Sequence, residues 1–431
     1  MNQMSEEAAR KFKYWQIRTI IGTMVGYAAF YFVRKNLSIA IPAILDDPGL
    51  GFSKAELGLI LTLMGVCYGI SRFVNGMVGD RVISKYFMAG GLILSAICNI
   101  IFGLSSSLIV FTIVWIFNGW FQGTGFPPCV RLLTHWVPPK QLATKMSIWN
   151  TSHSIGAGLV LVVCGYIISS GLGWRWCFYI PSAVALAGAA FILISLRDTP
   201  KSVGLEELNI EQKKKEDKND DFKKILRKRV FANPYIWIIG IANFFVYVLR
   251  YAILDWGPTL LGEWKGISIN KAGWMVALFE LAGVFGMLTA GRVTDKFFGG
   301  RGPRVCVFCM LLATMFMALF WVLDSPPIWL ATLILACAGF FIYGPQALVG
   351  IAAANIATQE AAASAAGLTG LFGYASTIFS GWGLGYIAEH MGWSFAFASL
   401  MAFGIVGALV FMMSWKAKAN GYDEDKTLEK A

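Results

Sequence analysis

Two arginines, Arg34 and Arg250, lie within apolar stretches of the chain, in AAFYFVRKNLSIAI (residues 28–41) and FVYVLRYAILDW (residues 245–256). An arginine near the centre of a membrane-spanning helix costs about 2.5 to 3.5 kcal/mol on insertion scales, so its presence indicates a functional site. A guanidinium presents a rigid fork of donors that fits phosphate oxygens, and a phosphate monoester carries nearly two negative charges near neutral pH. The two arginines therefore predict a binding site for phosphate or a phosphate ester.

Five further titratable residues occur in apolar stretches: Lys35, Arg72, His153, Asp255 and Glu280. Lys35 and Asp255 are able to neutralise each other, because buried charges persist by pairing. Glu280 either joins them or pairs with an arginine. Arg72 either belongs to the site or extends its charged end toward water or a helix end, and His153 is either a hydrogen-bonded packing residue or part of the site.

Aromatic residues near these cations offer hydroxyl donors and apolar walls to a ligand. The predicted set comprises Tyr27, Tyr31, Tyr68, Phe126, Trp149, Tyr247, Tyr343 and Tyr374. Aromatic side chains also pack inside helical bundles and form belts at membrane interfaces. About half of this set is therefore expected to contact a ligand.

The composition is that of an integral membrane protein. Of 431 residues, 57% are hydrophobic and 14% charged, whereas soluble domains have about 25% charged residues. Stretches of 18 or more mainly apolar residues predict about twelve membrane-spanning helices. They lie near 17–44, 55–79, 86–106, 108–133, 143–170, 175–196, 235–262, 271–294, 304–323, 327–357, 361–388 and 394–415. No soluble basic domain is evident that would bind nucleic acid. No catalytic, metal-ligand or cofactor motif stands at a suitable spacing, so an enzyme is not expected.

Basic residues mark one side of the membrane. They occur before the first predicted helix and after the second, fourth and eighth, whereas the alternate connections are nearly free of Lys and Arg. Because positive charge accumulates on the cytoplasmic side, both termini are predicted to be cytoplasmic.

The two halves of the sequence share short motifs. YFVR (residues 31–34) and YVLR (residues 247–250) are 216 residues apart, and GMVGDR (residues 76–81) and GRVTDK (residues 291–296) are 215 apart. A charge-dense segment lies between the halves, so the sequence predicts two pseudo-symmetric six-helix bundles and a solvated connector. The predicted boundaries are 1–197 for the first bundle, 198–233 for the cytoplasmic linker, 234–416 for the second bundle and 417–431 for a cytoplasmic tail.

These motifs resemble those of a known family. GxxxD[RK], present in both halves, resembles the loop motif of the major facilitator superfamily, and GYAAFYFVRKN, WNTSHSIGAG, FVYVLRYAILDWGPTLL and FIYGPQALVG closely resemble its organophosphate:phosphate antiporters. The resemblance implies that Arg34 and Arg250 bind phosphate and that His153 contributes to substrate binding. It also implies that Lys35, Asp255 and Glu280 form interhelix salt bridges that change during transport.

The resemblance implies an all-α major facilitator fold in the inner membrane of a bacterium. Its expected activity is exchange of external hexose phosphate, such as glucose 6-phosphate, for internal inorganic phosphate by alternating access. A glycerol-3-phosphate:phosphate antiporter, a glucose-6-phosphate sensor acting with a histidine kinase, and a proton-coupled transporter of another anion remain alternatives. Thr369 occupies a position where the bacterial hexose-phosphate carrier has lysine. The sensor-type relatives also lack this lysine.

Overall fold

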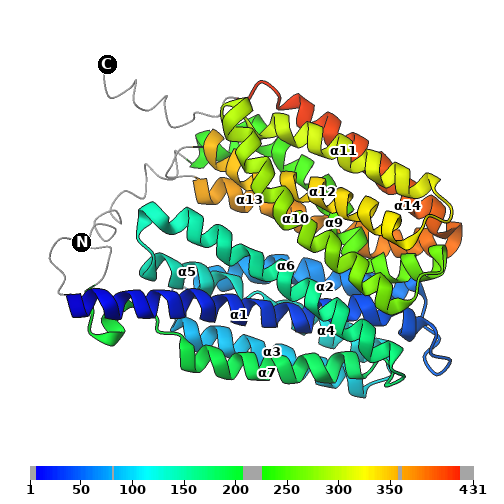
Figure 1. The fold of residues 1–431 in the computed structure, drawn as a ribbon, viewed down its shortest axis with the longest axis horizontal. Helices are drawn as coiled ribbons and strands as arrows, with labels where there is room; N and C mark the ends of the chain where they lie inside the picture. The colour runs from blue at the N-terminus through cyan, green and yellow to red at the C-terminus, as the bar shows by residue number, and fades with distance from the viewer. Residues whose placement is uncertain (1–5, 80–81, 207–225, 358–361, 418–431) are drawn as a thin grey trace. The chain divides into compact units, whose positions relative to one another are not determined.

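The computed structural model describes residues 6–79, 82–206, 226–357 and 362–417. Within these ranges the chain is helical, with no β-strand (Figure 1), which confirms the predicted all-α class. The end of the first loop motif (residues 80–81), most of the predicted linker and nearly all of the predicted tail lie outside the described residues.

Contacts divide the chain into two compact units. Unit 1 comprises residues 1–51 and 63–215, and unit 2 comprises residues 52–62 and 216–431. Helix α2 (Lys54–Gly79) is therefore shared, because its first turns cluster with unit 2 and the remainder with unit 1.

Unit 1 is a bundle built around its first helix. Its other elements are α3 (Ser84–Leu104), α4 (Leu108–Gln122), α5 (Phe126–Trp136), α6 (Pro139–Ser169), α7 (Trp176–Ser195) and a 3₁₀ turn, η1 (Pro200–Val203). Helix α1 (Glu6–Leu45) packs against α6 and α7, and α3 packs against α7 and α4 (Figure 1). Prolines in the first turn of α5 lack an amide hydrogen that a helix start leaves unpaired in any case, so they favour a new helix after α4.

Unit 2 is a second helical bundle. Its elements are a π-helical turn η3 (Leu226–Phe231), α9 (Pro234–Lys265), α10 (Ile269–Phe298), α11 (Gly302–Val322), α12 (Ile328–Ile356), α13 (Ala362–Ala375), a π-helical segment η4 (Ile378–Gly383) and α14 (Leu384–Met413). Glycines allow α10 and α12 to approach closely. A Cβ atom added to Gly286 would lie 1.9 Å from the Phe340 carbonyl oxygen, and one added to Gly339 would lie 2.4 Å from the Phe279 carbonyl oxygen.

The described residues contain 11 helical runs that are long and apolar enough to cross a membrane. The last run, Ala365–Met413, has 49 residues, whereas one crossing needs about 20. Gly392, with φ of 82°, interrupts this run inside α14, and counting the run as two crossings accounts for the twelve predicted spans.

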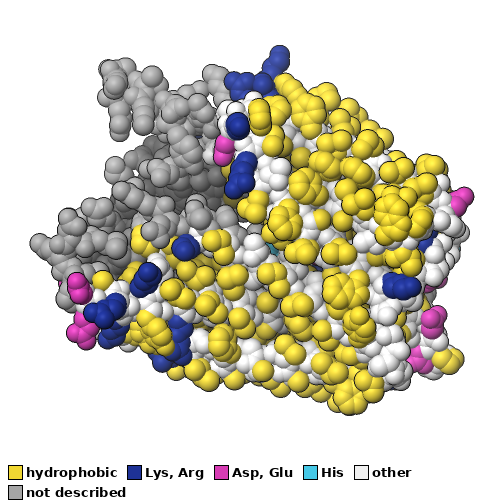
Figure 2. Space-filling view, in the orientation of Figure 1, with side chains coloured by type: hydrophobic (Ala, Val, Ile, Leu, Met, Phe, Trp, Pro, Cys, Tyr) yellow, Lys and Arg dark blue, Asp and Glu magenta, His cyan; other side chains and the backbone are white. Residues whose placement is uncertain are grey.

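The outer surface of the helices is apolar, as Figure 2 shows for one face. Leu104 is 72% exposed, Ile109 71% and Phe297 69%. Contiguous exposed apolar surface of this kind is unfavourable in water and suits hydrocarbon. The chain is a multi-pass membrane protein.

Candidate functional site

Arg34 follows a kink in α1. Val33 has non-helical backbone angles (φ −96°, ψ 15°), and its carbonyl oxygen accepts two hydrogen bonds, from Asn99 Nδ2 and Asn118 Nδ2, each at 2.9 Å. A kink removes a helix carbonyl from its usual partner, and in a bilayer the replacement donor must come from the protein. The amides on α3 and α4 therefore stabilise the break that sets the direction of Arg34.

The Arg34 guanidinium lies among tyrosine rings. Its Cζ atom is 3.8 Å from the ring centroid of Tyr68 on α2 and 5.4 Å from that of Tyr31, three residues earlier on α1. Arg34 is only 8% exposed. Stacking on aromatic faces stabilises a guanidinium that has been removed from water.

An aromatic wall continues from this arginine in unit 1. Tyr27 and Trp149 have ring centroids 4.9 Å apart, and Phe126 lies 5.6 Å from Trp149 and 6.3 Å from Tyr27. The Arg72 guanidinium lies over Phe126, 3.7 Å from its centroid. The structure thus places three predicted aromatic residues and Arg72 in one cluster.

His153 on α6 is buried next to the same wall. Its ring centroid is 5.7 Å from that of Tyr31. Its Nδ1 atom contacts the Asn150 carbonyl oxygen, and its Nε2 atom is 3.3 Å from Ser154 Oγ. The histidine therefore lies near Arg34's helix, and local contacts orient its ring.

Unit 2 contains an arginine in a related setting. Arg250 on α9 is 4% exposed, and its Nη2 atom is 3.4 Å from Oε1 of Glu280 on α10, which is fully buried. The hydroxyl of Tyr343 on α12 donates a hydrogen bond to the same carboxylate oxygen. Three helices thus supply a buried arginine, carboxylate and phenol that contact one another. Of the two partners that the sequence left open for Glu280, the structure has the arginine.

Tyrosines surround Arg250 as they do Arg34. The Arg250 guanidinium is 4.6 Å from the ring centroid of Tyr343, 5.7 Å from Tyr251 and 6.0 Å from Tyr247. Tyr374 lies 6.1 Å from Tyr247. Each arginine therefore lies over the tyrosine three residues before it and over a second tyrosine from another helix. Tyr251 was not predicted from the sequence, although its position next to Arg250 and four residues after Tyr247 was a usable signal.

Two polar atoms of the Arg250–Glu280 pair have no hydrogen-bond partner among the described residues, namely Arg250 Nε and Glu280 Oε2. Buried polar atoms are rarely left unpaired, because each such group costs about 1 to 3 kcal/mol. The guanidinium therefore retains donor capacity that an anion could use.

The remaining two predicted charged residues are also buried. Lys35 follows Arg34 on α1 and Asp255 lies one turn beyond Arg250 on α9, and each is 6% exposed. Both helices contain an internal proline, Pro42 in α1 and Pro258 in α9, again 216 residues apart. The repeat thus extends beyond the arginines to the breaks in their helices.

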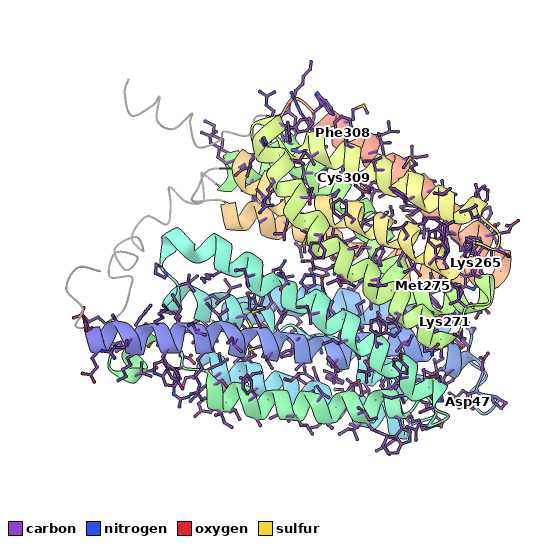
Figure 3. The ribbon with its side chains drawn as sticks, viewed as in Figure 1. Asp47, Lys265, Lys271, Met275, Phe308 and Cys309 are labelled. Carbon is purple, nitrogen blue, oxygen red and sulfur yellow. The ribbon has the colours of Figure 1, made fainter. Side chains whose placement is uncertain are left out.

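A cavity of about 270 Å³ lies elsewhere in unit 2, at the ends of α9 and α11 and the starts of α10 and α12. Lys265 and Lys271 belong to its lining (Figure 3). Lys265 Nζ donates to the Leu323 carbonyl oxygen at 2.7 Å and so caps α11, and Asp324 adds negative charge to the lining. The buried arginine clusters, rather than this cavity, combine charge with burial, and the Arg250 cluster also has an unpaired donor among the described residues.

The spanning helices and the charged groups buried among them are features of a membrane transporter. A profile described as "Major Facilitator Superfamily" matches residues 23–381 and 260–429. The chain belongs to this superfamily and, within it, to the organophosphate:phosphate antiporter family.

Relatives with three kinds of name resemble nearly the whole chain. It is 38% identical to "Probable hexose phosphate transport protein" of Chlamydia pneumoniae, covering 96% of this chain and 94% of that protein. It is 37% identical to "Glycerol-3-phosphate transporter" of Bacillus subtilis (94% and 93%) and 36% identical to "Membrane sensor protein UhpC" of Escherichia coli (94% and 93%).

A solved structure has the same fold at much lower sequence identity. The inward-facing, occupied structure of a bacterial homologue of the human lysosomal transporter Spinster matches with a TM-score of 0.74 at 16% identity, covering 93% of this chain and 96% of that one. At this identity the likeness concerns the fold alone.

Proposed function

We propose that this protein exchanges an external organic phosphate, with hexose phosphate as the first candidate, for internal inorganic phosphate by alternating access. The observation that carries this proposal is the pair of repeat-related arginines, each buried in a spanning helix and stacked on tyrosines. A phosphate monoester supplies the charge and the oxygen atoms that two guanidiniums require. Arg34 and Arg250 bind the phosphate in this proposal, and His153 with the surrounding aromatic residues binds the organic part.

Glu280 is part of the exchange mechanism in this proposal. Without substrate, its carboxylate offsets the charge of Arg250 at 3.4 Å. An incoming phosphate competes for the same guanidinium, so the carboxylate acts as a built-in substitute anion. An exchanger needs such a device, because it must reorient when loaded and remain in place when empty.

The names of the relatives support a sugar phosphate and also favour two alternatives. One relative is named a glycerol-3-phosphate transporter and another a membrane sensor, so a glycerol-3-phosphate carrier and a receptor acting with a kinase are the competing functions. We also propose that the protein lies in the inner membrane of a bacterium with both termini in the cytoplasm.

The test uses purified protein in liposomes loaded either with inorganic phosphate or with an inert anion. Uptake of labelled glucose 6-phosphate is measured beside uptake of labelled glycerol 3-phosphate. We expect glucose 6-phosphate uptake that requires internal phosphate and is lost in Arg34→Lys and Arg250→Lys. Arg175→Lys is the matched control, because Arg175 is partly exposed at a loop, where it contacts Asp47 and Ser106.

Each alternative predicts a different result. Uptake that does not depend on internal phosphate would exclude antiport. Faster uptake of glycerol 3-phosphate would identify the glycerol-phosphate branch. Binding of glucose 6-phosphate without any flux would favour the receptor.

A further inference from the structure

Two arginines outside the transport clusters meet at the end of α7. Arg18 of α1 donates from Nη2 to the Ile194 carbonyl oxygen at 3.1 Å. Arg197 donates from Nη1 to the Leu196 carbonyl oxygen at 2.8 Å and is 3.4 Å from the same Ile194 oxygen. Because both guanidiniums reach one carbonyl oxygen, two positive charges are held close together in unit 1.

Aromatic rings hold these guanidiniums in place. The Arg18 and Arg197 guanidiniums lie 5.1 and 5.0 Å from the ring centroid of Trp15, and Arg18 Nη1 donates to the Tyr14 hydroxyl at 2.5 Å. The indole of Trp136 on α5 donates to the Arg197 carbonyl oxygen at 2.7 Å. The pair is therefore preorganised before any ligand binds, which lowers the entropy lost on binding.

The negative charge next to the pair is already engaged. Among the described residues neither Arg18 nor Arg197 forms an ion pair with a carboxylate. Asp198, which follows Arg197, accepts hydrogen bonds from the backbone amides of Ser84 and Lys85 at 2.6 and 3.3 Å. The helix end offers only partial negative charge, so the two guanidiniums have positive charge available for an external anion.

The surface beside the pair is apolar and faces outward. Ile17 and Ile21 on α1 are 47% and 49% exposed, and Ile194 at the end of α7 is 64% exposed. In Figure 2, basic and acidic side chains lie together around the start of α1, and hydrophobic side chains predominate beyond it. Cations beside exposed isoleucines, in contact with Tyr14 and Trp15, match the chemistry of a membrane interface.

We propose that Arg18 and Arg197 bind the phosphate of an anionic phospholipid, whose acyl chains lie along Ile17, Ile21 and Ile194. Two adjacent guanidiniums suit a phosphodiester with no positive charge of its own, whereas a choline head group would bring a third cation to the site. The exposed isoleucines favour a lipid over a free phosphate ion. This site is separate from the transport clusters and does not depend on the proposed substrate.

Native mass spectrometry of the purified protein tests this proposal. Equal amounts of phosphatidylglycerol and phosphatidylcholine are added in detergent, and the retained lipids are counted. We expect at least a fivefold excess of retained phosphatidylglycerol for the wild type and loss of that excess in Arg18→Gln/Arg197→Gln. Lys11→Gln/Lys13→Gln is the matched control, because it removes the same charge from exposed positions of the same helix, and it should retain the excess.

Three results would overturn the lipid site. These are an unchanged excess in the arginine variant, an equal loss in the lysine control, and equal retention of both lipids by the wild type. The deacylated head group, glycerophosphoglycerol, is used as a competitor at the same concentration, and displacement of the lipid by it would show a soluble phosphate site instead. If the double arginine variant does not fold, Arg18→Gln and Arg197→Gln are measured singly, and each should lose at least half of the excess. Wild-type retention in both would equally refute the proposal.

Discussion

Substitution of Glu280 by glutamine tests the competition between a carboxylate and phosphate for Arg250. Glu280 is fully buried, and its Oε1 atom contacts Arg250 at 3.4 Å and accepts a hydrogen bond from Tyr343. Glutamine has nearly the same shape and retains an oxygen acceptor for the tyrosine, but it carries no charge. Glu280→Gln should therefore strengthen binding of inorganic phosphate and of glucose 6-phosphate to the purified protein.

The magnitude follows from the bond that is weakened. A hydrogen bond that involves a charged group contributes about 1.5 to 3 kcal/mol. Because Arg250 stays charged, its bond to a neutral glutamine falls toward the lower end of this range, whereas its bond to the carboxylate lies toward the upper end. The side chain at position 280 thus holds Arg250 more weakly by about 1 to 1.5 kcal/mol. This corresponds to a dissociation constant for phosphate or glucose 6-phosphate that is roughly five- to tenfold lower. Exchange turnover should fall together with KM, because a ligand held more tightly is released more slowly.

Isothermal titration calorimetry with each ligand measures this change directly. Glu263→Gln is the matched control, because Glu263 is a partly exposed carboxylate on α9 that pairs with Lys54 at 2.9 Å. This variant should bind each ligand with the affinity of the wild type. An unchanged or weaker affinity in a folded Glu280→Gln variant would refute the competition. Equal strengthening in both variants would show a general effect of net charge.

Three further predictions concern stability and are measured by thermal unfolding of the purified protein. Gly286→Ala should destabilise unit 2 by about 1 to 3 kcal/mol through overpacking, whereas Gly291→Ala on the same helix, where an added Cβ meets no atom within 4 Å, should be neutral or stabilising because alanine favours helix. Equal melting temperatures for the two variants would contradict the close contact. Asn99→Ala should cost about 1 to 3 kcal/mol by removing a buried amide donor from the kink in α1, and a wild-type melting temperature would show that this donor is dispensable. The hydrogen bond from Trp174 Nε1 lowers the pKa of Asp47 (Figure 3) below its ordinary value of 3.8. The stability due to this carboxylate is therefore present above about pH 4 and is lost as pH falls further. Asp47→Asn should make the melting temperature less sensitive to acid than in the wild type, and identical acid profiles would rule out this contribution.

Much of the fold was predictable because a spanning helix is a local property. Each span depends on about 20 consecutive apolar residues, and the bilayer imposes this requirement on each segment separately. The duplicated arginine motifs were visible for a similar reason, since a charge stands out in an apolar stretch and the constant spacing of 216 residues relates the two copies. The break between the last two spans was visible as well, because Gly392, which interrupts the 49-residue helical run inside α14, lies between the predicted spans 361–388 and 394–415.

Only the tertiary structure decided which groups meet. The contact between Arg250 and Glu280 depends on the rotation of α9 and α10 about their own axes, and Tyr343 reaches the carboxylate from a third helix. Gly283 leaves room for that phenol, since a Cβ added there would lie 2.4 Å from the Tyr343 ring. The sequence by itself determined the class of fold, the spanning segments and the paired arginines. Partner choice came from packing, because side chains distant in the chain meet only when close contacts between helices set the facing surfaces.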